Sequence, residues 1–531
     1  MRGLQFVLAI MLIFCFTGNV IATSGSHQQK AKRHAVKHGK ARSTSAKKSH
    51  SASRKVVSKT PRKRETESTG IQVPSQINGK GQLVYVLNRI ISSVDNGNAD
   101  IGVYVKSLRS GETLYVRNVY QPMTPASIMK ILTAEAALLY LGPNYRFATQ
   151  LLTDAKGVRN GVLQGNLYIV LSGDPSLTYP DLVELTAKLQ SQGITAVSGN
   201  VYIDNTAYDQ RFYGPGWGGK DKNYCYGAPI SASIINHNCL PLSMMPSKVT
   251  GNKATVITSP IHFYPGIQNS VVTKNSRRDC SLRMTKNSNS SINLDGCLAK
   301  NNQGWGVSYV VTDIPEYNRT LFKSLLRRQG VDVYGSVTFG SAKGSLSLVA
   351  AHHSEPLPEL IRDMLKKSDN VIAGALFKKL GQLYSNRPGS WENGSIAVSK
   401  ILSKHAGVQT SGMRLLDGSG LSVDNLATPA QFMQVLQFAY ANNKTSEYFI
   451  SSLPIAGVDG TLKRRMFNIA RKIRAKTGTI SGVVSLAGYA TSYNKDPLAF
   501  VIIVNGNKGL NWRYKSMEDK IATALTHYVD A

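Results

Sequence analysis

The sequence predicts an α/β (α+β) protein in which an antiparallel sheet flanked by helices is interrupted by β-rich insert domains. Three observations predict this architecture. The N-terminal part has the pattern of a helix and a hairpin, and the C-terminal part has the pattern of strands and a helix. A long stretch between them has short alternating segments rich in Gly, Ser and Asn. Both ends can therefore contribute to one sheet. The 531 residues are too many for one ordinary core and fit two or three domains.

The first structured part, residues 71–144, contains three expected elements. Residues 82–94 place apolar side chains at helical spacing. Residues 101–118 alternate in polarity and contain a Ser-Gly turn, which predicts a β-hairpin. Residues 124–142 have a proline near the start and a glycine at the end, which predicts a largely buried helix.

The last part, residues 346–531, has the complementary pattern near its end. Residues 474–492 predict a strand, a turn and a strand, and residues 497–507 predict another apolar strand. An amphipathic helix follows, so these elements can complete the sheet. Between the two parts, residues 145–345 carry many short alternating strands with frequent Gly, Ser and Asn. This pattern of strands and composition predicts β-rich insert domains. We expect two of them, one nested within the other.

The N-terminus carries the features of an exported protein. Residues 1–22 combine one arginine with an uncharged apolar run and a small-residue cleavage site, which predicts a signal peptide. A retained membrane anchor is the alternative, since the run is nearly long enough to span a bilayer. We therefore expect a periplasmic or otherwise exported protein, either free or attached peripherally to the cell wall or membrane.

Residues 23–70 form a basic tail that contains much of the formal charge of +32. From Ser24 to Glu65 there are fourteen Lys/Arg and one acid. The tail has almost no bulky apolar side chains, so we expect it to be disordered. In an exported protein, anionic wall polymers or a membrane surface are the expected partners rather than a specific nucleic acid. A solvated linker without a partner is the alternative.

Four cysteines remain once Cys15 leaves with the export segment: Cys225, Cys239, Cys280 and Cys297. An even count in an oxidising compartment predicts two disulfides. Three connectivities are open, and sequential pairing closes the shortest loops. Zinc spacings are absent from the sequence, so we expect no metal and no cofactor.

Three short motifs occur in order along the chain. They are Ser127-Ile128-Met129-Lys130, Ser368-Asp369-Asn370 and Lys476-Thr477-Gly478. Each motif alone is weak, because other S-x-x-K and S-x-N matches occur in the chain. Lys-Thr-Gly occurs once, and the three contexts are a helix start, a loop entering a helix and a strand edge. Together they are the motif set of β-lactamases and penicillin-binding proteins.

Each motif can supply one part of an acyl-transfer site. Ser127 and Lys130 share a helix face, so a desolvated Lys130 can act as general base for a Ser127 nucleophile. Ser368 can relay a proton to the leaving amine. Asn370 can hydrogen-bond a substrate amide and steady Lys130. Lys476 supplies a fixed positive charge that suits a substrate with a free carboxylate.

The strand edge at Lys476, Thr477, Gly478 and Thr479 can pair with an extended peptide substrate. The backbone N–H groups of Thr479 and Ser127 are then the expected oxyanion hole.

On these motifs the chain resembles the class C low-molecular-mass penicillin-binding proteins, the D-alanyl-D-alanine carboxypeptidase/endopeptidase family. The wide gap between Ser127 and Ser368 is similar to that family, as are residues 172–177, 226–231, 417–422 and 457–462. The resemblance implies a penicilloyl-serine-transferase/β-lactamase-like domain with nested inserts, and an acyl-enzyme on Ser127. It implies hydrolysis of D-Ala-D-Ala ends or D-Ala–diaminopimelate crosslinks of peptidoglycan stem peptides, and covalent inhibition by β-lactam antibiotics.

The resemblance also suggests that Asp174 faces the cleft and binds the amine of a diaminopimelate side chain. An Asp before Pro is more often a turn residue, and that alternative stays open. A β-lactamase-type hydrolase is a second candidate, although no E-x-x-L-N stretch is present to supply a deacylating Glu. A wall-binding scaffold protein is a third, against which the intact motif set argues.

Overall fold

The computed structural model describes residues 71–530, except residues 96, 259–265, 277–279 and 288–290. The chain divides into two units, residues 1–68 and 69–531, and the account below concerns the second. The expected signal peptide (1–22) and basic tail (23–70) lie outside the described residues. Within the described part of the chain, no helix has both the length and the apolar character needed to cross a bilayer.

A five-stranded antiparallel sheet joins the two ends of the chain in the order β20-β21-β22-β2-β3. Its strands are β2 (Asp100–Ser107), β3 (Thr113–Arg117), β20 (Ile473–Ile480), β21 (Val483–Thr491) and β22 (Pro497–Asn505). β2 from the front pairs with β22 from the back along eight residue pairs. The sheet expected from both chain ends therefore forms.

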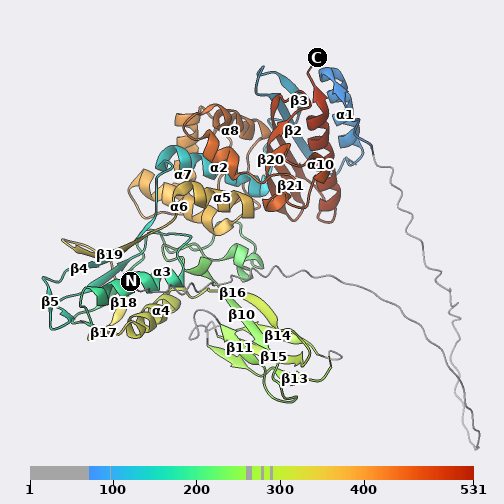
Figure 1. Cartoon of the computed structure of the whole chain (residues 1–531). Coiled ribbons are helices and arrows are strands. Elements are labelled where there is room, and N and C mark those ends of the chain that lie inside the picture. Colours follow the sequence, from blue (N-terminus) through green and yellow to red (C-terminus); the bar gives the residue numbers. More distant parts are fainter. Residues whose placement is uncertain (1–70, 96, 259–265, 277–279, 288–290, 531) are drawn as a thin grey trace, which may run out of the picture. The chain divides into compact units, whose positions relative to one another are not determined.

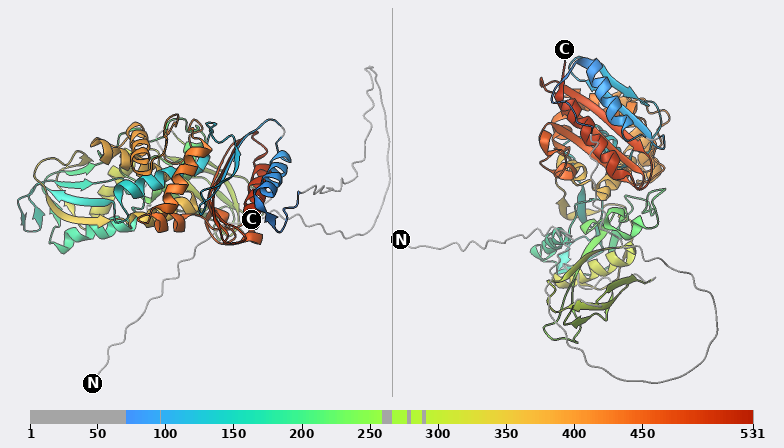
Figure 2. Two further views of the ribbon diagram at one scale, coloured as in Figure 1. Left: turned by 90° about the horizontal axis from the view of Figure 1, so that it is seen from above. Right: turned by 90° about the vertical axis from the view of Figure 1, so that its right-hand side faces the viewer.

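Helices cover both faces of this sheet. On one face lie α1 (Gly79–Ser92) and α10 (Asn511–His527), as Figure 1 and Figure 2 show. Their buried residues and those of the sheet form one hydrophobic core. The short strands β1 (Ile77–Asn78) and β23 (Tyr528–Val529) pair beside them.

The other face packs against a helical half that contains a second core. Its helices are α2 (Met129–Leu141), α5 (Leu357–Lys367), α6 (Asn370–Ser385), α7 (Trp391–Ala406), α8 (Pro429–Ala441) and α9 (Ser446–Ser452). Ten consecutive residues of α2, Met129 to Leu138, are buried. This helix lies in the centre of the domain because it has almost no polar face to expose.

The insert begins with a mixed sheet in the order β18-β9-β7-β4-β19, with α3 (Tyr179–Ser191) and α4 (Ile314–Arg328). The strands are β4 (Ala148–Thr153), β7 (Leu167–Val170), β9 (Val201–Asp204), β18 (Val337–Phe339) and β19 (Ser347–His353). A small sheet contains β5 (Val158–Arg159), β6 (Val162–Leu163), β8 (Ala196–Val197) and β17 (Asp332–Val333). Because β19 pairs with β4, the insert sheet extends past residue 345.

A second, all-β insert is nested between β9 and α4. It contains β10 (Cys239–Met245), β11 (Thr255–Thr258), β12 (Ile267–Asn269), β13 (Val272–Lys274), β14 (Leu282–Lys286), β15 (Ile292–Ala299) and β16 (Trp305–Val310). Two disulfides, Cys225–Cys239 and Cys280–Cys297, join cysteines whose Cα atoms lie 5.6 and 5.2 Å apart. Of the three open connectivities, the structure contains the sequential one.

Candidate active site

Ser127 lies in a 3-10 turn, Ala126–Ile128, directly before α2. Ala126 has a φ of 50°, in the left-handed region that costs energy for a residue with a Cβ. The surroundings hold this turn in place. Ser485 Oγ donates to Pro125 O at 2.7 Å, and a Cβ on Gly420 would lie 1.8 Å from Ala126 O. Close packing from both sides therefore fixes the serine at the start of the helix.

Lys130 is fully buried, one helical turn beyond Ser127. Its Nζ lies 3.0 Å from Ser127 Oγ, 2.6 Å from Asn370 Oδ1 and 2.7 Å from Ser419 O. Burial lowers the pKa of this amine to about 7, because desolvation disfavours the charged form. The nearby carboxylates of Asp417 and Asp369 oppose that effect. The amine is thus poised to gain or lose a proton near neutral pH.

The second motif connects two helices. Ser368 ends α5 in the left-handed conformation, with a φ of 59°. Asp369 caps α6, since its Oδ1 accepts from two backbone N–H groups of the first turn at 2.8 and 2.9 Å. Asn370 then accepts from Lys130 and donates from Nδ2 to Tyr226 O at 2.8 Å. The amide therefore ties the catalytic helix α2 to a loop of the insert.

The third motif lies on β20, the edge strand of the main sheet. Lys476 is fully buried, and its Nζ donates to Ser368 Oγ at 2.9 Å and to Thr477 O at 2.6 Å. Burial holds its pKa well below the ordinary lysine value, and the charge of Lys130 lowers it further. A Cβ on Gly478 would lie 2.9 Å from Ser127 N, so the strand passes very close to the nucleophile.

The structure brings all three motifs to one cleft of about 510 Å³. The residues that line it are Ser127, Asp221, Tyr226, Ser368, Asn370, Leu421, Val423, Thr479, Ile480 and Ser481. Lys130 and Lys476 lie beneath this surface, in contact with its two serines.

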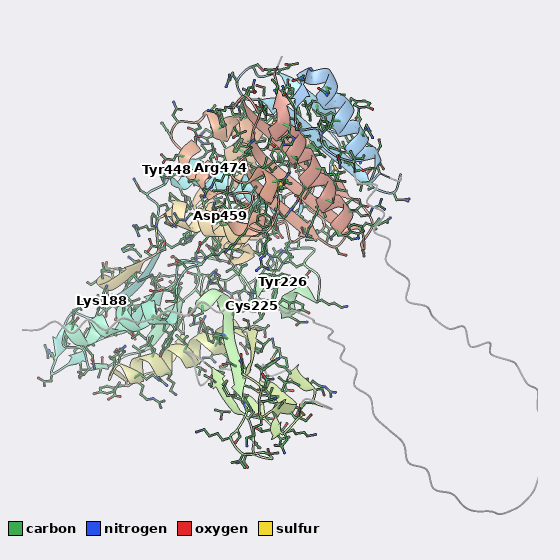
Figure 3. All side chains as sticks on the ribbon, turned by 45° about the vertical axis from the view of Figure 1, so that its right-hand side comes forward. Lys188, Cys225, Tyr226, Tyr448, Asp459 and Arg474 are labelled. Carbon is green, nitrogen blue, oxygen red and sulfur yellow. A yellow bond between two sulfur atoms is a disulfide. The ribbon has the colours of Figure 1, made fainter. Side chains whose placement is uncertain are left out.

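Asp221 is a cleft residue that the sequence did not identify, and Tyr226, which begins the family-like stretch 226–231, lies beside it. Tyr226 is 47% exposed and donates from its hydroxyl to Asp221 Oδ1 at 2.8 Å. Burial and the adjacent carboxylate raise the pKa of Tyr226 to about 12, so its hydroxyl stays protonated. Figure 3 labels Tyr226 beside Cys225, whose disulfide anchors this loop to β10. Among the described residues that line the cleft, Asp221 is the one acid.

A buried carboxylate supports the cleft from behind. Asp417 accepts hydrogen bonds from five donors: Trp217 Nε1, Ser419 N, Gly420 N, Ser422 N and Asn425 Nδ2. This network shapes the loop whose Ser419 carbonyl accepts from Lys130. The sequence predicted a turn at residues 417–422 but gave no sign that the indole of Trp217, from the insert, would donate to Asp417.

Asp174 is not brought into the cleft, which corrects the expectation that it faces the substrate. It lies between β7 and α3 with its side chain 0% exposed. Its Oδ1 accepts from Ser176 N at 2.8 Å and from Ser176 Oγ at 2.6 Å. The carboxylate therefore stabilises a turn, the alternative that an Asp before Pro favours.

Comparison with known proteins identifies the same fold and family. A family model described as the D-Ala-D-Ala carboxypeptidase 3 (S13) family matches residues 85–528. The chain is 34% identical over 414 residues to the D-alanyl-D-alanine carboxypeptidase DacB of Haemophilus influenzae, covering 77% of this chain and 86% of that protein. It is 32% identical over 444 residues to a D-alanyl-D-alanine carboxypeptidase of an Actinomadura species, covering 80% and 81%.

A solved structure gives the same result. The crystal structure of penicillin binding protein 4 from Haemophilus influenzae matches with a TM-score of 0.73 and 31% identity, covering 83% of this chain and 99% of that one. The same protein in complex with a β-lactam matches with a TM-score of 0.69. The expected fold class is confirmed. The chain belongs to the D-Ala-D-Ala carboxypeptidase 3 (S13) family of serine peptidases.

Proposed function

We propose that this protein hydrolyses D-Ala-D-Ala ends of peptidoglycan stem peptides, and D-Ala–diaminopimelate crosslinks between them, through an acyl-enzyme on Ser127. One observation carries the proposal. The Nζ of Lys130 lies 3.0 Å from Ser127 Oγ, in surroundings that lower its pKa to about 7. A neutral amine within hydrogen-bond reach of a hydroxyl is the arrangement that general-base activation of a serine requires.

In the acylation step, Lys130 removes the proton as Ser127 Oγ forms a bond to the carbonyl carbon of the penultimate D-Ala. The backbone N–H groups of Ser127 and Thr479 stabilise the oxyanion, since the edge strand passes beside the nucleophile. The C–N bond then breaks, and Ser368 relays the proton from Lys130 to the leaving amine. Water hydrolyses the ester in the second step and restores the free serine.

Lys476 favours substrates with a carboxylate next to the scissile bond. In the free protein, burial lowers the pKa of Lys476 and the charge of Lys130 lowers it further. A bound carboxylate opposes both effects and raises the pKa. The positive charge of Lys476 and a substrate carboxylate therefore stabilise each other. Both the terminal D-Ala and the diaminopimelate of a crosslink present such a carboxylate.

Asp221 suits the amine-bearing side of the substrate. A lone carboxylate at the cleft surface attracts a cation, and the hydroxyl of Tyr226 holds its orientation. A diaminopimelate side chain carries an amine that can fill this role. We therefore assign to Asp221 the contact that the sequence had suggested for Asp174.

Partners and location follow from this activity. β-Lactam antibiotics are expected to acylate Ser127, and stem peptides are the substrates. The protein is proposed to act in the periplasm, or exported and peripheral to the wall or membrane. Binding of the basic tail to anionic wall polymers or a membrane surface stays a prediction from composition.

Labelling with a fluorescent penicillin tests the proposal. The wild type should label in a one-to-one ratio, and Ser127→Ala should not label at all. Ser481→Ala is the matched control, because it makes the same change at an exposed serine of the same cleft. Digestion of crosslinked muropeptides, analysed by mass spectrometry, then separates release of D-Ala from conversion of dimers to monomers. An unlabelled wild type, or labelling of Ser127→Ala, would refute the assignment.

A further inference from the structure

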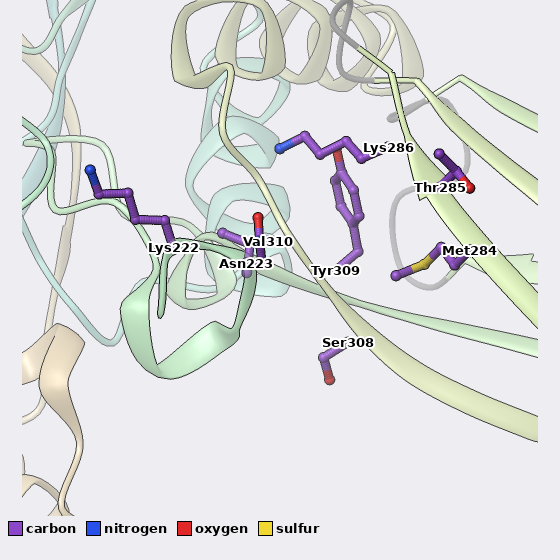
Figure 4. A pocket seen from close by; sticks show the side chains of 8 residues that line it. All are labelled: Lys222, Asn223, Met284, Thr285, Lys286, Ser308, Tyr309 and Val310. Atoms are coloured by element: carbon purple, nitrogen blue, oxygen red, sulfur yellow. The ribbon is translucent and has the colours of Figure 1, made fainter. Parts of the chain in front are cut away.

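A second hollow, of about 350 Å³, lies where the insert loop meets the nested all-β insert (Figure 4). Its walls come from the turn Asp221–Asn223, from β14 and from β16. The lining residues are Lys222, Asn223, Met284, Thr285, Lys286, Ser308, Tyr309 and Val310. The chemistry described above uses none of them.

The hollow is cationic on an apolar base. Lys222 Nζ lies 5.0 Å from the ring centroid of Tyr213, and Lys286 Nζ lies 5.5 Å from that of Tyr309. Figure 4 shows the Lys286 side chain extending above Tyr309 toward the side where Lys222 stands. No Asp or Glu is among the described residues that line it.

Two carboxylates stand near the lysines but are not among the residues that line the hollow. Desolvation, the larger effect, lowers the pKa of Lys286, and Asp313 raises it. Asp221 precedes Lys222, and its side chain lines the catalytic cleft, where it accepts from the Tyr226 hydroxyl. A ligand that brings a negative charge would offset the desolvation of Lys286.

The hollow and the catalytic cleft share one loop. Asp221 lines the cleft, and Lys222, the next residue, lines the hollow. Tyr226, at the end of the same loop, lines the cleft. This loop therefore borders both spaces.

The nested insert also carries a general positive charge. Residues 239–313 contain eight Lys/Arg and three Asp/Glu, a net charge of +5. Such a field attracts polyanionic substrates but does not select one position. The two lysines that line the hollow, beside Met284, which is 37% exposed, add a defined site within that field.

We propose that this hollow is an accessory subsite that binds a carboxylate of the stem peptide remote from the scissile bond, through Lys222 and Lys286. The proposal rests on the peptidase function above and extends it to larger substrates. Stem peptides carry acidic residues besides their carboxyl end, and the aliphatic part of such a residue suits Met284 and Tyr309. The subsite therefore favours crosslinked over minimal peptides.

A comparison of two substrates tests it. One is a crosslinked muropeptide dimer that ends in D-Ala-D-Ala. Either release of the terminal D-Ala or cleavage of the crosslink then gives a rate from which kcat/KM is measured. The other is the same dimer with only the carboxylates remote from both scissile bonds amidated. We expect the wild type to prefer the acid over the amide by about tenfold in kcat/KM, mostly through KM, as for a partly exposed charge-assisted hydrogen bond. Lys286→Gln and Lys222→Gln should lower this preference toward one.

Two controls separate the subsite from general attraction. Lys300→Gln removes the same charge from an exposed position of the same insert and should keep the tenfold preference. Lys286→Arg should keep most of it. Removing the glycan from both substrates should leave the preference unchanged, because the carboxylate belongs to the peptide.

The outcomes are distinguishable from failure of the peptidase assignment. A wild-type ratio near one, an unchanged ratio in Lys286→Gln, an equal loss in Lys300→Gln, or a preference that disappears with the glycan would each overturn the subsite. A wild type that hydrolyses neither dimer and fails to label with penicillin overturns the proposed function instead.

Discussion

Acylation of Ser127 should depend on pH through the amine of Lys130. Burial lowers the pKa of Lys130 from 10.5 to about 7. At pH 7 about half of the molecules then carry the neutral base, against about one in three thousand for an ordinary lysine, a gain of about 10³. The rate of acylation should rise roughly tenfold per pH unit at acidic pH and level off above about pH 7.

The assay is the second-order rate constant for labelling by a fluorescent penicillin, measured from about pH 5 to about pH 9 to span that pKa. Asp369→Asn gives an internal check. Asn can still cap α6, but the carboxylate that raises the pKa of Lys130 is lost. The acid limb, which is the part of the pH profile where the acylation rate rises, should therefore move to lower pH. Asp363→Asn, at an exposed position of α5, is the control and should leave the limb in place.

Two results would refute this reasoning. An acylation rate that is constant across the acid range would mean that no group of this pKa acts as the base. A limb in Asp369→Asn that moves to higher pH would mean that the carboxylate does not act on Lys130 by charge.

The remaining predictions concern the supports of the cleft. Gly478→Ala should slow acylation by roughly 100-fold, because the new Cβ would lie 2.1 Å from Ser485 Oγ and displace the edge strand; a rate within a few-fold of wild type would contradict this. Asp417→Asn should lower the free energy of unfolding in urea by about 3 kcal/mol, since five donors point at that carboxylate; an exposed Asp→Asn change should cost almost nothing. Replacing Cys225 and Cys239 together by Ser should cost about 3 kcal/mol for a loop of this length, and an unchanged urea midpoint would argue against it.

Local patterns explain why the sequence located the main cleft. Ser127 and Lys130 meet because they are three residues apart at a helix start, and this spacing is visible in the sequence. Lys476 was predicted on a strand edge because residues 474–492 have a strand, turn and strand pattern, and the structure places it on β20. Strand patterns at the two ends of the chain predicted a shared antiparallel sheet, and the pairing of β2 with β22 joins its two parts.

Contacts between distant segments could not be predicted in this way. The carbonyl of Tyr226 meets Asn370 across 144 residues, and Trp217 meets Asp417 across 200. No spacing rule relates such pairs, because the fold of the inserts brings them together. For the same reason Asp221 was missed, and β19 was not recognised as a strand of the insert sheet.

The low pKa that activates Lys130 has a cost for folding. A lysine with a pKa of 10.5 unfolded and about 7 folded binds fewer protons in the folded state, so its burial opposes folding below pH 10.5. The penalty grows as the pH falls, to about 4 kcal/mol at pH 7, and levels off at about 5 kcal/mol at lower pH. Hydrogen bonds to Asn370 and Ser419, and the apolar packing of α2, must offset it. These groups come from three segments far apart in the chain, so the base becomes reactive only when the whole domain has closed around it.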